Sequence, residues 1–248
     1  MSTKPLGRSL AVALAVIAAI AIPAFTMSQD IGLSQAEFAG LGDQTLRAAP
    51  YAFSIWGVIY LGLIANGLYQ LLAARESATL AALAWPSEVA ILGCGVWILA
   101  SAFNAQWASV AIIVTSATAL IVGLDRARRD EPAPSKTDRL LIAWPMTLLA
   151  GWLTIASGLN LFTVLTAQGL IQPQLMWSVG AVSAVVLVAA AVGWRLRSMV
   201  YLVPVVWGLV GVYVAEQADK PTVAALAAGG ALALALEAIL LTRARRTA

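Results

Sequence analysis

The chain contains about eight stretches of roughly 20 mainly apolar residues, and each is long enough to cross a hydrocarbon core of about 30 Å as an α-helix. Only 11% of the residues are charged, whereas soluble domains carry about 25%. The ten-residue alternation of an outer-membrane barrel is missing. The sequence therefore predicts an all-α integral membrane protein, with helices at about 8–27, 52–73, 86–104, 107–125, 139–163, 175–194, 199–216 and 222–242.

The positive charges divide unevenly between the two sides of these helices. With the N-terminus inside, thirteen of the fifteen Lys and Arg residues fall on the inner side, and only Arg47 and Lys220 fall outside. This asymmetry follows the positive-inside rule, so we expect a bacterial inner (cytoplasmic) membrane protein with both termini in the cytoplasm. The first segment also resembles a secretory signal. It is long, however, and lacks a clean small-x-small cleavage site before the polar stretch, so we expect a retained helix.

The composition excludes several chemistries. There is no histidine, which excludes a histidine general base, zinc chemistry and histidine-ligated haem iron. Cys94 is the single cysteine, so neither an intramolecular disulfide nor a thiol-cluster metal site can form. No lysine lies in mid-membrane, which excludes a retinal Schiff base. The basic residues form no basic face and no catalytic constellation is visible, so we expect no nucleic-acid partner, no required cofactor and no enzyme.

The nine tryptophans divide by depth. Tryptophan near a helix end is the expected interfacial anchor, and five fit this description: Trp85, Trp107, Trp144, Trp177 and Trp194. Four others lie deeper, each on a different helix: Trp56, Trp97, Trp152 and Trp207. At that depth an indole N–H needs a partner, and a shared interior surface would provide one.

Helical spacing gathers further residues around three of these tryptophans. Phe53, Trp56 and Tyr60 make one aromatic stripe, Trp97 shares a face with Asn104, and Trp152 precedes Asn160 by about two turns. Interhelical packing explains any one of them. Together they predict a pocket for a flat, largely apolar ligand, because such pockets combine aromatic walls with a few polar groups.

Other polar residues within the helices receive structural interpretations. Glu88 follows Pro86 at the expected start of a helix, where a carboxylate complements the helix dipole, so we expect a cap. Glu237 is expected to snorkel or to pair with the terminal arginines, with a proton-linked site as the alternative. Asn66, Tyr69 and Gln70 lie in the inner half of the second expected helix, within YLGLIANGLYQLL (60–72). We expect them to tie this half to neighbouring helices.

Three motifs resemble a known family. PYAFSIWGVIY (50–60), AFNAQW (102–107) and WLTIASGLN (152–160) are similar, in the same order, to the second, third and fifth helix signatures of the TspO/MBR family, the tryptophan-rich sensory or translocator proteins. The resemblance spans roughly residues 8–163. It implies a five-helix bundle that binds porphyrins, other tetrapyrroles or in some cases sterols, under a lid formed here by residues 28–50. The motif residues carried over are Trp56, Tyr60, Asn104, Trp107, Trp152 and Asn160.

These observations combine into one hypothesis with two alternatives. Residues 1–165 are expected to form a TspO-like bundle and 170–248 a three-helix extension. The expected function is to bind a hydrophobic ligand, with a tetrapyrrole as first candidate, in a sensory, regulatory or transport role. The alternatives are a proton-coupled secondary transporter and a non-catalytic assembly protein, which would meet a second copy or another membrane protein through the small-residue ridge Ala225, Gly229 and Ala233. The full set of expected ligand-binding residues is Phe53, Trp56, Tyr60, Trp97, Asn104, Trp107, Trp152 and Asn160.

Overall fold

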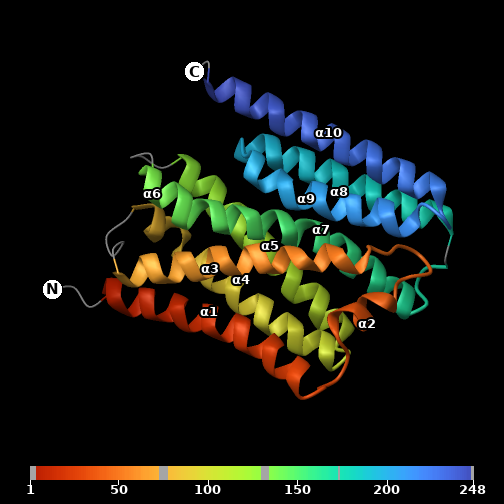
Figure 1. The fold of residues 1–248 in the computed structure, drawn as a ribbon, viewed down its shortest axis with the longest axis horizontal. Helices are drawn as coiled ribbons and strands as arrows, with labels where there is room; N and C mark the ends of the chain where they lie inside the picture. Colours follow the sequence, from red (N-terminus) through yellow and green to blue (C-terminus); the bar gives the residue numbers. More distant parts are fainter. Residues whose placement is uncertain (1–3, 73–77, 130–133, 173, 247–248) are drawn as a thin grey trace.

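The computed structural model describes residues 4–72, 78–129, 134–172 and 174–246, and most of them are helical (Figure 1). Eight helices in these ranges are long and apolar enough to cross a membrane, which confirms the predicted all-α membrane architecture. They are α1 (Lys4–Ser28), α3 (Ile55–Leu72), α4 (Ala78–Ala102), α5 (Gln106–Arg129), α7 (Trp144–Ala167), α8 (Leu175–Leu196), α9 (Met199–Glu216) and α10 (Pro221–Arg246). Short elements connect them: α2 (Gln35–Gly40), the 3₁₀ turn η1 (Pro50–Ser54), α6 (Lys136–Asp138) and the π-helical turn η2 (Arg139–Ala143).

The long helices pack into two adjoining groups (Figure 1). α1 lies against α3 and α4, α4 lies against α5, and α5 lies against α7. The last three helices form one side of the molecule, where α9 packs between α7 and α10. A single cluster of buried hydrophobic residues extends from Val12 in α1 to Leu241 in α10. The division into units at 1–165 and 170–248 stays a prediction.

Glycine allows α7 and α9 to approach closely. A Cβ on Gly151 of α7 would lie 2.0 Å from the Tyr201 carbonyl oxygen of α9, so only glycine fits there. The Tyr201 hydroxyl also donates to the Thr154 hydroxyl of α7 at 2.9 Å. Small residues and interhelical hydrogen bonds are the usual means of helix association in lipid. This contact fixes the C-terminal helices against the bundle.

The predicted start of a helix near residue 86 is wrong, and so is the role of Glu88 as its cap. α4 begins at Ala78, and Pro86 lies inside it. Proline is tolerated inside a membrane helix where neighbours accommodate it. Here Gly123 of α5 leaves the space, because a Cβ at that position would lie 2.5 Å from the Pro86 Cγ atom.

Two of the three residues predicted to tie the inner half of α3 to its neighbours, Asn66 and Tyr69, do so, whereas Gln70 bonds within α3. The Asn66 side-chain amide donates to the Leu141 carbonyl oxygen of η2 at 2.9 Å. The Tyr69 hydroxyl donates to Asp138 of α6 at 3.0 Å, and Gln70 donates to Asn66 within α3 at 2.6 Å. These bonds satisfy the Asn66 amide and the Tyr69 hydroxyl, which would otherwise be costly in lipid, while the Gln70 Oε1 atom is buried without a partner among the described residues.

Two features of α10 bear on the alternative functions. Glu237 forms no ion pair with Arg243, and the side chains of Arg245 and Arg246 lie outside the described residues. Its carboxylate lies against α8, where a Cβ on Gly193 would come within 2.9 Å of Oε1. The small-residue ridge of α10 is exposed, and a Cβ on Gly229 would meet no atom within 4 Å. The ridge therefore makes no close helix contact among the described residues.

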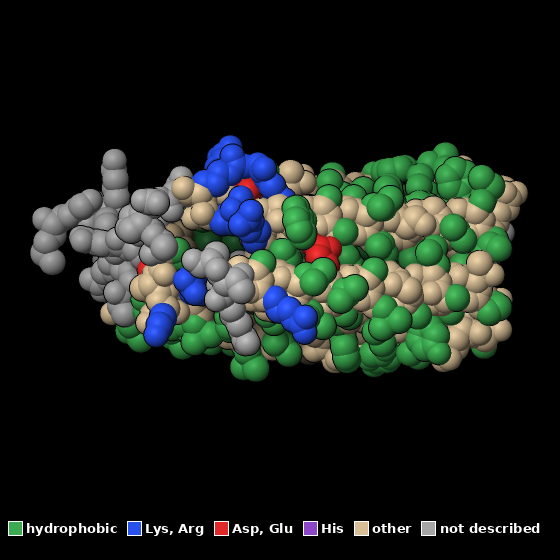
Figure 2. Space-filling model, turned by 90° about the horizontal axis from the view of Figure 1, so that it is seen from above, with side chains coloured by type: hydrophobic (Ala, Val, Ile, Leu, Met, Phe, Trp, Pro, Cys, Tyr) green, Lys and Arg blue, Asp and Glu red, His purple; other side chains and the backbone are tan. Residues whose placement is uncertain are grey.

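The two ends of the bundle differ in charge. On the face drawn in Figure 2, Lys and Arg side chains gather toward one end, and the rest of that face shows hydrophobic side chains among backbone and uncharged polar groups. Figure 1 shows that both chain termini lie toward this end and that α2 lies at the other. Asp125 forms ion pairs with three arginines of the basic end, Arg128, Arg129 and Arg195. The chain is an integral membrane protein with its basic residues concentrated at the end opposite the lid.

Candidate ligand-binding cavity

A cavity of about 380 Å³ lies beneath the lid segment, residues 28–50, and its walls come from η1, α3, α4, α5, α7 and α9. Its volume falls in the range of small-molecule sites, roughly 300–1,000 Å³. Five aromatic side chains line it: Phe38, Phe53, Trp56, Trp97 and Trp152. Ser116, Asn160 and Thr163 add polar groups, while Asp43 and Arg47 contribute from the lid. Aromatic walls with a few polar groups are what the sequence predicts for this pocket.

Trp152 of α7 is the centre of the aromatic wall and is only 6% exposed. Phe53 and Trp56 each meet it edge to face, both with ring centroids 6.3 Å apart. Trp56 also stacks on Tyr60, with centroids 5.3 Å apart and planes 27° apart. Edge-to-face and offset-stacked rings attract one another through their quadrupoles, so these side chains fix each other's orientation.

The lid adds an aromatic residue that sequence reasoning missed. Phe38, on the short helix α2, is 1% exposed, and its ring meets Trp97 edge to face at 6.3 Å. α2 begins with a capping box, in which the Ser34 backbone N–H donates to Glu37 at 2.8 Å and the Glu37 N–H donates to the Ser34 hydroxyl at 3.2 Å. These bonds lower the pKa of Glu37. A capping box before an apolar residue, SQAEF, is the signal that could have identified this helix.

Gly32 allows the lid to cross the end of α4. It adopts a left-handed backbone conformation with φ of +67°, and a Cβ there would lie 2.2 Å from the Ala102 carbonyl oxygen. The next residue, Leu33, donates its N–H to the same oxygen at 3.0 Å. Only glycine satisfies both the conformation and the approach.

The polar groups of the cavity differ in how far they are already satisfied. Asn160 is 6% exposed, and its amide donates to the Ser109 hydroxyl of α5 at 3.0 Å. The indole N–H of Trp97 is buried and meets no acceptor among the described residues. A buried donor without a partner costs free energy. Trp97 therefore contributes its ring to the cavity wall, while its N–H is buried within the surrounding packing.

The structure brings five of the eight predicted site residues together at the cavity, namely Phe53, Trp56, Trp97, Trp152 and Asn160. Tyr60 lies behind Trp56 and outside the lining. Asn104 lies in the turn after α4 with φ of +52° and accepts a hydrogen bond from Gln106 at 3.0 Å. Trp107 is the second residue of α5 and is 49% exposed. α4 ends at Ala102, so Asn104 no longer shares the helical face of Trp97.

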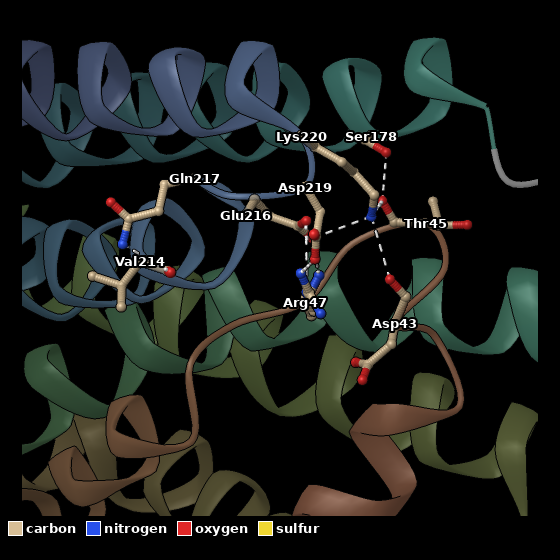
Figure 3. A network of polar contacts seen from close by, with 9 residues as sticks. All are labelled: Asp43, Thr45, Arg47, Ser178, Val214, Glu216, Gln217, Asp219 and Lys220. Carbon is tan, nitrogen blue, oxygen red and sulfur yellow. Dashed lines mark hydrogen bonds and ion pairs between the residues drawn. The ribbon is translucent and has the colours of Figure 1, made fainter.

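A fully buried carboxylate holds the lid from outside the cavity. Glu216, at the end of α9, is 0% exposed and contacts both cations that the sequence assigns to the outer side. It accepts the Arg47 backbone N–H at 2.8 Å, lies 3.6 Å from the Arg47 guanidinium and lies 3.3 Å from the Lys220 ammonium (Figure 3). Asp219 pairs with Arg47 as well, and this hydrogen bond raises the pKa of Arg47. We call Arg47, Glu216, Asp219 and Lys220 the Glu216 cluster.

Backbone groups of the lid complete its attachment to the C-terminal helices. The Lys220 ammonium donates to the carbonyl oxygens of Asp43 and Thr45, at 3.3 and 3.0 Å (Figure 3). The Ser178 hydroxyl of α8 donates to the Thr45 carbonyl as well. Farther along, the Ala49 N–H donates to the Gly211 carbonyl oxygen at 2.9 Å. Sequence reasoning missed Glu216, although its spacing of four residues from Lys220 was a signal for an ion pair.

Trp207 extends this attachment to η1. Its indole N–H donates to the Ala52 carbonyl oxygen at 3.0 Å, and its ring meets Tyr51 edge to face at 5.3 Å. The four tryptophans predicted to lie deep are all less exposed than the other five, which are 37–72% exposed. Trp207 therefore serves the attachment of η1 to α9, whereas Trp56, Trp97 and Trp152 line the cavity.

Comparison with known proteins gives one match. A family model described as TSPO-like protein matches residues 9–240. The matched range reaches into all eight membrane helices, so it extends beyond the motifs of residues 50–160 into the three C-terminal helices. No curated protein and no solved structure matches the chain.

Proposed function

The chain belongs to the TSPO-like protein family, and on that basis we propose that it binds a flat, largely apolar ligand in the cavity beneath the lid. A porphyrin or another tetrapyrrole is the first candidate. The observation that carries this proposal is the aromatic wall that Phe53, Trp56, Trp97 and Trp152 form along the cavity. Flat conjugated molecules stack on such walls, and burial of their apolar faces supplies the affinity.

The proposed binding relies on stacking and on few polar contacts. Asn160, held by Ser109, presents a polar group to the ligand, and Ser116 and Thr163 line the same cavity. The chain has no histidine to ligate haem iron, so a metal-free macrocycle suits the site better than haem. Arg47 is already paired with Glu216 and Asp219, so it is not a free cation for a ligand carboxylate.

The proposed role is sensory, regulatory or transport-linked, in the bacterial inner membrane with both termini in the cytoplasm. The gathering of Lys and Arg at the end that holds both termini supports this orientation, because basic residues favour the cytoplasmic side (Figures 1 and 2). In this orientation the lid faces the outer side, and ligand reaches the cavity from there.

The test is a titration of the detergent-purified protein with protoporphyrin, followed by tryptophan fluorescence and visible absorption. We expect saturable quenching in the wild type. The Trp152→Phe, Asn160→Ala variant should bind roughly tenfold more weakly, because it loses ring contacts and a polar anchor. Trp144→Phe is the matched control, since Trp144 is on the same helix but is 45% exposed. Equal affinity in all three proteins, or no saturation, would contradict the proposal.

A proton-coupled secondary transporter is the second candidate, and Glu237 favours it. The Glu237 Oε1 atom is buried and accepts no hydrogen bond among the described residues. An ionisable residue within a membrane helix is a functional-site hypothesis by default. In proteoliposomes, Glu237→Gln should abolish proton-driven uptake of protoporphyrin if this candidate is correct. Unchanged uptake in the variant, or no uptake by the wild type, would rule it out.

A further inference from the structure

The segment that covers one side of the cavity is the same segment that the C-terminal helices hold. Asp43, Leu46, Arg47, Ala48 and Ala49 all line the cavity. On its other side this stretch bonds to Glu216, Lys220, Ser178 and Gly211 of the last three helices and the turn between α9 and α10. Displacing this stretch from α9 would therefore open a wall of the cavity and leave the aromatic residues of α3, α4 and α7 in place.

Glu216 is the central acceptor of this attachment. Its side chain is 0% exposed, and both carboxylate oxygens meet groups of Arg47: Oε1 accepts the backbone N–H, and Oε2 faces the guanidinium. If the lid moves away, the Glu216 carboxylate loses Arg47 but keeps Lys220, because Lys220 lies only four residues after Glu216 in the chain. A buried carboxylate that loses one partner is strongly destabilised, so the closed position is favoured.

We propose that Glu216 is a positioning residue for the lid, and that the three C-terminal helices thereby set how fast ligand enters and leaves the cavity. This inference rests on the proposed function for its ligand, a flat apolar molecule. Glu216 does not line the cavity, so it acts through Arg47 and the lid backbone. Its replacement changes the rates of exchange more than the contacts of the bound ligand.

Cys94 offers a measurement that needs no ligand. It is the only cysteine of the chain, it is 4% exposed, and it lines the cavity. A small thiol reagent such as N-ethylmaleimide reaches it when the lid opens. The labelling rate of Cys94 in the full-length protein should therefore rise when the lid opens further.

The first experiment compares Cys94 labelling in the wild type, Glu216→Gln and Glu216→Ala. Glutamine keeps an acceptor for the Arg47 N–H but loses the charge, and alanine loses both. We expect labelling to accelerate about tenfold in Glu216→Gln and further in Glu216→Ala, as breaking a buried charge pair mainly raises dissociation rates. Asp125→Asn is the matched control, because Asp125 holds three arginines at the opposite end. Its labelling should equal that of the wild type.

A second variant separates lid opening from unfolding. Lys220→Met removes the donor to the Asp43 and Thr45 carbonyls and leaves Glu216 paired with Arg47. Lys220→Met should also accelerate Cys94 labelling. The thermal unfolding midpoint of each variant is measured in detergent, and a midpoint well above the labelling temperature shows that the variant is folded during labelling. Unchanged labelling in both folded Glu216→Gln and Lys220→Met would overturn the proposal.

The ligand measurement is stopped-flow quenching by protoporphyrin. We expect association and dissociation rates to rise together in Glu216→Gln, with a smaller change in Kd, whereas Trp152→Phe should raise Kd through dissociation alone. Faster labelling without saturable protoporphyrin binding would support the lid role and refute the proposed ligand. Saturable binding with unchanged labelling and unchanged rates would refute the lid role and leave the proposed ligand standing.

Discussion

Each end of the molecule has a carboxylate that pairs with more than one cation, Asp125 with three and Glu216 with two, but in different surroundings. At the basic end, the Asp125 side chain is 16% exposed and its three arginine partners are 36–57% exposed. At the lid end, Glu216 is 0% exposed, and its partners Arg47 and Lys220 are 32% and 21% exposed. Exposed ion pairs contribute about 0–1 kcal/mol, while breaking a buried pair costs about 3–5 kcal/mol. Similar residue types thus contribute little to stability at the basic end and hold the lid in place at the other.

The largest expected effect is the loss of stability when Glu216 is truncated, compared with the same truncation at Asp125. Glu216→Ala leaves Arg47 and Lys220 without their buried partner, so we expect a loss of about 3–5 kcal/mol in unfolding free energy. Asp125→Ala should lose about 1 kcal/mol or less. Denaturant unfolding in detergent micelles measures both. Losses of equal size at the two ends would contradict the comparison.

A smaller effect is expected where an indole ties η1 to α9. Trp207→Phe keeps the ring but removes the donor to the Ala52 carbonyl oxygen. We expect a loss of about 0.5–1.5 kcal/mol by the same unfolding measurement. Trp194→Phe at the basic end is the control, because Trp194 is 66% exposed, and it should be nearly neutral. If Trp207→Phe proved as neutral as its control, the bond to Ala52 would not hold η1.

The smallest effect concerns pH and the capping box of α2. The hydrogen bonds from Ser34 hold the folded-state pKa of Glu37 below its ordinary value of 4.5. The stabilisation of α2 is therefore complete above that ordinary value and is lost as pH falls through the lowered pKa. Amide hydrogen exchange of α2, corrected for intrinsic rates, should be slower in the wild type than in Glu37→Gln at neutral pH. The two proteins should converge in acid, and a difference that persists there would refute this assignment.

The membrane helices could be predicted because the length of an apolar run is a local property. The error at α4 has a physical reason: Pro86 is a common first residue of a helix, and the preceding stretch, ATLAALAW, is apolar enough to extend the span. The sequence does not reveal that Gly123 of α5 leaves room for the proline ring inside the helix. That space belongs to the packing of two helices.

The aromatic wall could be predicted in part because helical spacing fixes which residues share a face. Phe53 and Trp56 meet Trp152 because each faces the bundle interior on its own helix. Phe38 and Glu216 were missed because their roles depend on the path of the lid across the bundle, which no periodicity encodes. Glu216 is also 169 residues from its partner Arg47 in the sequence.

The most direct test of the account asks whether protoporphyrin and a thiol reagent compete for the space beneath the lid. Cys94 lines the cavity, so a ligand bound there should protect it from N-ethylmaleimide. We predict that saturating protoporphyrin slows Cys94 labelling in the wild type, and that protection is weaker in the Trp152→Phe, Asn160→Ala variant at the same concentration. Protoporphyrin that binds saturably but leaves Cys94 labelling unchanged would contradict the central claim, because the ligand would then occupy another site.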